Sequence, residues 1–76
     1  MFDHIKEIEM ITNQKPTIIF ETPGFLLNDN QEKILVVFET VGGEKILWSM
    51  APGQLLPFRV KKLLEADTTT RLFICW

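Results

Sequence analysis

The feature that most constrains the fold of this chain is a pair of apolar segments joined by two glycines. Residues 34–41 and 44–50 are rich in β-branched, aromatic and other apolar side chains, and Gly42-Gly43 separates them. Glycine readily adopts the positive φ angles of the two-residue primed turns that match strand twist. The two segments are therefore predicted to form an antiparallel hairpin with a two-residue turn.

That turn would set the register of the hairpin and place Val37 opposite Trp48 and Phe38 opposite Leu47. A hairpin with one solvated face should alternate between apolar and polar residues. This hairpin alternates only near its turn and is apolar on both faces toward its open end, so both faces need a cover, from the same chain or from another. One face would carry Leu35, Val37, Ile46, Trp48 and Met50, and the other Ile34, Val36, Phe38 and Leu47.

The N-terminal part of the chain has a helical pattern. Asp3 is a suitable N-cap, and Ile5, Ile8 and Ile11 recur every three residues, which predicts an amphipathic helix over residues 3–13. Residues 17–21 are β-branched and aromatic and predict a strand. Thr22-Pro23-Gly24 then suits a type II turn, and Phe25-Leu26-Leu27 suits a short returning strand before the polar loop 28–31.

Residues 55–67 admit two interpretations. Val60, Leu63 and Leu64 have helical spacing, and Pro57 suits a first helical turn, whereas Leu56, Phe58 and Val60 alternate as in a strand. We favour a short helix over residues 57–66. The segment Arg71–Trp76 predicts a last strand that is apolar on both sides and hence central or covered.

Together these elements predict a single α+β domain spanning residues 1–76, with the order α-β-(β)-β-β-α-β. We expect a mainly antiparallel sheet of about three to five strands, packed by the N-terminal helix and by the second, short helix.

The overall composition argues against several classes of function. The net charge is −2 and the isoelectric point is near 5.2, which disfavours non-specific binding to nucleic acid. The N-terminus has no apolar signal-peptide region, and no segment approaches the about 20 apolar residues of a membrane span. We therefore expect a cytoplasmic protein that does not enter a membrane.

Catalytic and metal-binding patterns are absent from the sequence. Asn28, Asp29, Asn30 and Glu32 lack the spacing of a calcium loop, and we interpret them as a polar surface loop. The reactive groups available to an enzyme are Glu39, His4 and the single cysteine, Cys75, and nothing in the sequence brings them together. We expect a protein without cofactor or metal that is not an enzyme.

Three aromatic residues are candidates for contact with a partner. Tryptophan is enriched at binding hot spots because it buries a large area around one polar group. Trp48 lies on the two-faced hairpin beside Phe38, and Trp76 ends the chain, where a residue frays unless it docks onto its own core or a partner. We predict that these three aromatic residues contact a partner.

Arg59, Lys61 and Lys62 are the one concentration of positive charge. They offer contacts to a protein partner or, in an alternative hypothesis, a small nucleic-acid-binding platform with Trp48 or Phe58 nearby.

Our leading hypothesis is a non-enzymatic protein-protein interaction module that self-associates, for example as a homodimer, through apolar sheet surface. Small proteins of this kind, such as phage and mobile-element inhibitors of host enzymes, often inhibit or regulate a larger protein. The sequence does not identify that partner.

Overall fold

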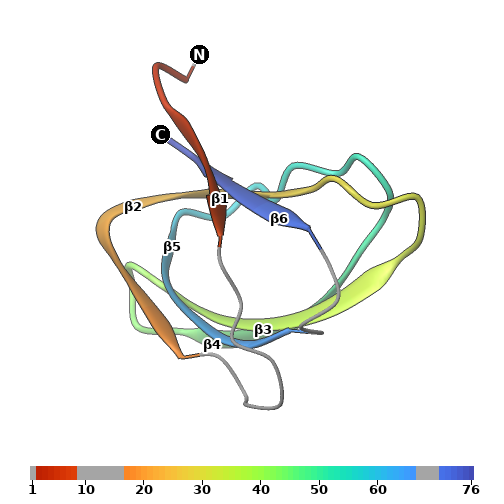
Figure 1. Ribbon diagram of the computed structural model, residues 1–76. Helices are drawn as coiled ribbons and strands as arrows, with labels where there is room; N and C mark the ends of the chain where they lie inside the picture. Colours follow the sequence, from red (N-terminus) through yellow and green to blue (C-terminus); the bar gives the residue numbers. More distant parts are fainter. Residues whose placement is uncertain (1, 9–16, 67–70) are drawn as a thin grey trace.

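Six antiparallel strands make up the protein in a computed structural model that describes residues 2–8, 17–66 and 71–76 (Figure 1). The strands form one sheet in the order β1-β6-β2-β5-β3-β4. Their bounds are β1 Ile5–Ile8, β2 Ile18–Asn28, β3 Ile34–Thr40, β4 Lys45–Met50, β5 Val60–Ala66 and β6 Leu72–Cys75.

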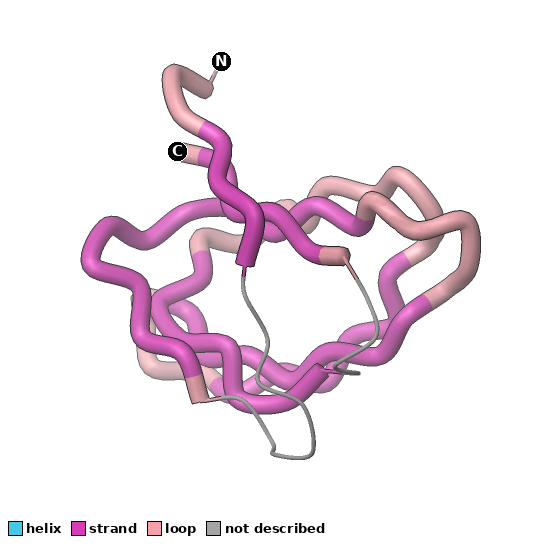
Figure 2. Tube along the Cα trace, in the orientation of Figure 1, coloured by secondary structure: helices cyan, strands magenta, loops and turns pink. Residues whose placement is uncertain are grey.

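Strand β2 bends and so divides the sheet into two layers. Its first residues pair with β5, and its last four pair with β6, with a shift of register between Ile19 and Gly24. In Figures 1 and 2, β1, β6 and the end of β2 lie above β3, β4 and β5. Pro23, which has no N–H group to donate, lies at this irregularity. The predicted turn at residues 22–24 is therefore wrong, because one long strand continues through the bend.

Gly24 allows the close approach of β2 and β6. A Cβ atom there would overlap the carbonyl oxygen of Cys75 and lie 2.9 Å from Cγ1 of Ile74. The layers then enclose one core, which takes alternate residues from both. Its fully buried apolar side chains are Leu26, Val36, Phe38, Met50, Leu56, Val60, Leu63 and Leu72.

The prediction of an α+β fold is wrong, because the described residues contain strands and no helix. Within the predicted helix 3–13, residues 5–8 form β1, and residues 9–13 lie outside the described part. Ile8 is buried and Ile5 is 61% exposed, as expected for strand residues on opposite faces. The backbones of His4 and Trp76 exchange hydrogen bonds of 2.8 and 3.0 Å, which bring the two ends of the chain side by side (Figure 1). This pairing between chain ends overrides the three-residue spacing of isoleucines.

The predicted helix 57–66 is also wrong, and strand β5 occupies most of it. The pairing of β5 with β3 shifts register twice, between Val37 and Phe38 and between Glu39 and Thr40. Each shift adds a residue to β5 and thereby interrupts its two-residue alternation. The buried residues Val60, Leu63 and Ala66 consequently fall three apart. Two bulges in a strand thus imitate the spacing of a helix.

The β3–β4 hairpin is confirmed, but its predicted register is wrong by one residue. The loop has three residues: Gly43 N–H donates to the Thr40 carbonyl, Thr40 N–H donates to the Glu44 carbonyl, both at 2.9 Å, and Gly43 has a φ of 86°. This is the three-residue loop that ends in a left-handed glycine bulge. Gly42 has no positive φ, whereas a primed Gly-Gly turn of type I′ needs two such residues.

The corrected register sorts the hairpin into an inner and an outer face. Phe38 lies opposite Ile46 and Val36 opposite Trp48, and these four side chains point to the core. Val37 lies opposite Leu47 on the outer face, where Leu35 is the next residue of β3. The predicted strand at residues 71–76 is confirmed as β6, which lies between β1 and β2.

Candidate protein-binding surface

Three apolar side chains gather on the outer face of the hairpin, and we call Leu35, Val37 and Leu47 the hairpin patch. Val37 and Leu47 are cross-strand partners. Leu35 is 62% exposed, Leu47 is 67% exposed and Val37 is half-buried. A single exposed leucine is ordinary on a protein surface, but adjacent exposed apolar residues mark a candidate contact.

Charged groups border the hairpin patch. The Lys62 Nζ atom lies 3.5 Å from Glu39 Oε2, and Lys45 lies opposite Glu39 in β4. Glu65 is opposite Val37 in β5. A shallow hollow extends from the patch to the loop residues 30–33. An apolar centre with a polar rim is the usual composition of a protein interface.

The predicted binding residues Phe38 and Trp48 lie on the inner side of the hairpin. Phe38 is fully buried, with its ring 5.9 Å from that of Phe58. Trp48 is half-buried and meets the Phe58 ring edge to face at 5.3 Å. Both side chains pack in the core, and of the two only Trp48 has surface exposed to solvent.

Trp76 docks onto its own chain. Its ring stacks on His4 at 5.2 Å, and its backbone is hydrogen-bonded to the same residue. It also lines a second hollow with Phe2, Phe25 and Arg59, in which the Arg59 guanidinium lies 5.8 Å from the centre of the Phe25 ring. The end of the chain is thus held within the fold.

The structure does not gather the three predicted basic residues into one site. Arg59 lines the hollow beside Trp76, whereas Lys62 forms its ion pair with Glu39 on the outer face. Lys61 is exposed at the first bulge of β5. The positive charges of residues 59–62 therefore meet different neighbours.

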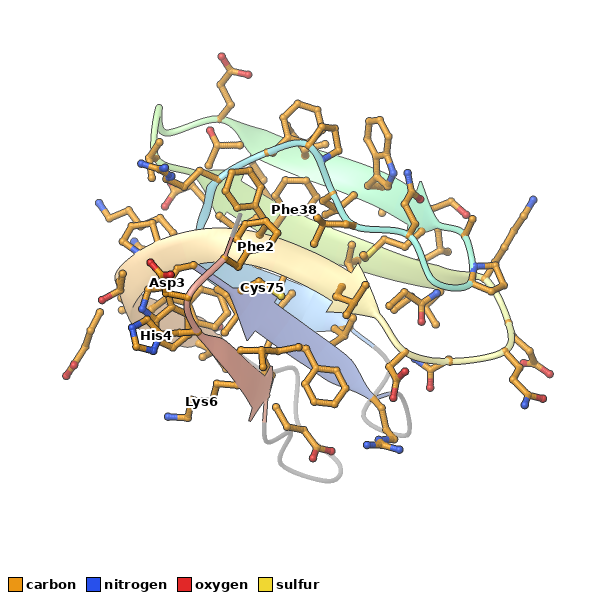
Figure 3. The ribbon with its side chains drawn as sticks, turned by 90° about the horizontal axis from the view of Figure 1, so that it is seen from above. Phe2, Asp3, His4, Lys6, Phe38 and Cys75 are labelled. Carbon is orange, nitrogen blue, oxygen red and sulfur yellow. The ribbon has the colours of Figure 1, made fainter. Side chains whose placement is uncertain are left out.

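The potentially reactive groups do not form a catalytic arrangement. His4 lies just before β1 and Cys75 lies in β6 (Figure 3), but His4 shares a face with Trp76, so Cys75 points to the other face. Burial raises the pKa of the Cys75 thiol, which disfavours the nucleophilic thiolate. Glu39 lies in β3, which β2 and β5 separate from β6, and it forms an ion pair with Lys62. Among the described residues, no three histidine, cysteine or acidic side chains are grouped to hold a metal ion.

Asn28 has a structural role that its sequence context did not indicate, since it was predicted to lie in a polar surface loop. Asn28 is fully buried at the end of β2. Its amide nitrogen donates to the carbonyl oxygens of Glu32, Met50 and Ala51 at 3.0–3.2 Å, and its Oδ1 accepts from Asn30 N–H at 2.9 Å. The available signal was the two-residue alternation of a strand. Asn28 follows Leu26 by two residues and so lies on the same, buried face.

Leu35 and Leu47 were also missed as partners on a common face, because the predicted register placed them on opposite faces. No sequence signal corrects this register, because valine favours a strand and only the structure places Val41 in the loop.

Comparisons with known proteins add no functional information. No protein-family model matches the chain, and no curated protein or solved structure is significantly similar to it. Over residues 2–8, 17–66 and 71–76, no helix is long and apolar enough to cross a membrane.

Proposed function

We propose that this protein is a non-enzymatic protein-binding module that contacts its partner through the hairpin patch. The observation that carries the proposal is the exposure of Leu35 and Leu47 on one face of the hairpin, at 62% and 67%. The inner-face residues of both strands pack in the core, so the patch belongs to an ordered sheet and not to a loop. A preorganised apolar surface loses little conformational entropy on binding.

The partner in this proposal is a larger protein that the module inhibits or regulates. The rim pairs Lys62 with Glu39 beside Lys45, so it offers both signs of charge to a protein surface. A nucleic-acid partner requires a basic field, and the net charge of −2 together with the separation of Arg59 from Lys62 favours the protein partner.

A capture experiment with matched variants tests this proposal. The immobilised protein would be exposed to an extract of its source cells, alongside Leu35→Lys and the control Ile19→Lys. Ile19 is 64% exposed and belongs to β2, on the far side of the Lys62–Glu39 pair, so the control has equal exposure outside the patch. Because both sites are exposed, each variant should unfold within about 0.5 kcal/mol of the wild type.

The expected result is a captured protein that is retained by Ile19→Lys and lost with Leu35→Lys. The proposal is refuted when every captured protein binds Leu35→Lys as well as it binds the wild type.

A further inference from the structure

Strand β4 ends the described sheet on one side and pairs there with β3 alone. Thr40 N–H donates to Glu44, so the antiparallel alternation directs the backbone groups of residues 44, 46, 48 and 50 to β3. The N–H and C=O groups of Lys45, Leu47 and Ser49 consequently point away from β3, along the open edge. These residues also have their side chains on the outer face, the face of the hairpin patch.

This edge has few of the features that usually protect an edge strand. Native proteins protect such edges with proline, bulges, short strands or central charges. Strand β4 has six residues without proline or bulge, and its one charge, Lys45, is at its first position. Strand β1, the other end of the sheet, has four residues with Lys6 and Glu7 in its middle. The edge of β4 is therefore the better template for an added strand.

We propose that β4 pairs antiparallel with β4 of a second copy of this chain, about a two-fold axis at Leu47. Centred on Leu47, the pairing uses all three residues with free backbone groups and forms six hydrogen bonds, two for each of three pairs. Lys45 then lies opposite Ser49 of the second copy. Centring on Lys45 would place two like charges opposite each other, and centring on Ser49 would carry the pairing into Pro52.

The pairing joins the two hairpin patches. Leu47 meets Leu47 of the second copy on the outer face, and each is followed inward by Val37 of its own β3. The result is one continuous apolar stripe across the two copies. This inference goes beyond the proposed function, because it depends on the strand edge and not on a contact between the patch and another protein.

The size of the contact sets its strength. The six residues of β4 extend for about 20 Å, so a single strand edge buries much less area than the about 800 Å² per partner of a standard interface. We therefore expect a reversible dimer that populates in the micromolar range and dissociates on dilution.

Sedimentation equilibrium over a range of concentrations tests the dimer on the purified full chain. The wild type and the Ile19→Lys control should dimerise with the same dissociation constant, since Ile19 belongs to β2. Leu47→Lys places two cations at the axis and should weaken dimerisation at least about tenfold. A wild type that stays monomeric into the high micromolar range overturns the proposal, and so does a dimer that Leu47→Lys leaves unchanged.

Cysteine cross-linking tests the register. Hydrogen-bonded antiparallel partners have Cα atoms about 5.5 Å apart, within reach of a disulfide. Under mild oxidation, Leu47→Cys should form a covalent dimer much faster than the matched control Leu35→Cys, because Leu35 lies in β3 and β4 separates it from the axis in each copy. Equal rates overturn the register. The capture experiment depends on Leu35 in a monomer or a dimer, so either proposal can fail while the other stands.

Discussion

The side-chain amide of Asn28 joins three parts of the chain, and its replacement gives the sharpest test of how the fold is held. Its nitrogen donates to the carbonyl oxygens of Glu32, Met50 and Ala51. The change Asn28→Asp keeps the shape of the side chain and its acceptor oxygen, removes the two N–H donors and, at neutral pH, adds a negative charge. No cavity forms, so the change in stability reports the polar contacts of this side chain, and its dependence on pH separates the cost of the charge from the lost hydrogen bonds.

The magnitude follows from those two donors. A hydrogen bond contributes about 1 kcal/mol net, and a buried acceptor left without a donor costs about 1–3 kcal/mol. We expect Asn28→Asp to lower the free energy of unfolding at neutral pH by about 3–5 kcal/mol. Domains of this size are stable by about 4–11 kcal/mol, so the loss is a large part of the total. It corresponds to a fall in Tm of roughly 12–40 °C.

The loss of stability in Asn28→Asp should be larger at neutral pH than at low pH. Burial and three nearby carbonyl oxygens disfavour the charged carboxylate, so the pKa of the new carboxyl group is raised in the folded state. A raised pKa in the folded state means that stability is retained below the unfolded value of about 3.9 and lost as pH rises above it. The variant should therefore be closer to the wild type near pH 3 than at neutral pH.

Urea unfolding followed by tryptophan fluorescence measures this, since Trp48 and Trp76 are both half-buried in the fold. Gln31→Glu is the matched control, because it makes the same chemical change at an exposed position in the adjoining loop and should stay within about 0.5 kcal/mol of the wild type. The reasoning is refuted if Asn28→Asp loses less than about 1 kcal/mol at neutral pH, or if its loss is the same at both pH values.

Two further predictions concern the hairpin loop and the buried thiol. Gly43→Ala should destabilise the protein by about 1 kcal/mol, because the φ of Gly43 is 86°, while Gly42→Ala should be nearly neutral; equal losses in urea unfolding would contradict the assigned loop. Burial raises the pKa of the Cys75 thiol above its ordinary value of 9.0, so the wild type should lose stability relative to Cys75→Ala as pH rises beyond that value. If the difference in unfolding free energy between the two proteins stays constant across that pH range, the prediction is contradicted.

The sequence determined those features that depend on neighbouring residues. The β-branched and aromatic residues of segments 34–41 and 44–50 and the two glycines between them were enough to predict the hairpin. The apolar segment 71–76 was enough to predict a central or covered strand. The same segments predicted that both faces of the hairpin need a cover, from this chain or from another. In the structure the inner face packs on the core, and Leu35 and Leu47 are exposed on the outer face.

Only the tertiary structure decided the features that depend on distant partners. Residues 5–8 become a strand because β6, at the other end of the chain, offers them backbone hydrogen bonds, and their isoleucine spacing carries no trace of that partner. In β5, two bulges against β3 change a two-residue period into a three-residue one. A single side chain, Asn28, looked like a loop residue because its hydrogen-bond acceptors include residues 22 and 23 positions away. Side-chain periodicity is local, whereas pairing, register and bulges are set by contacts between segments, so the pattern predicted which surfaces exist and the structure decided where they face.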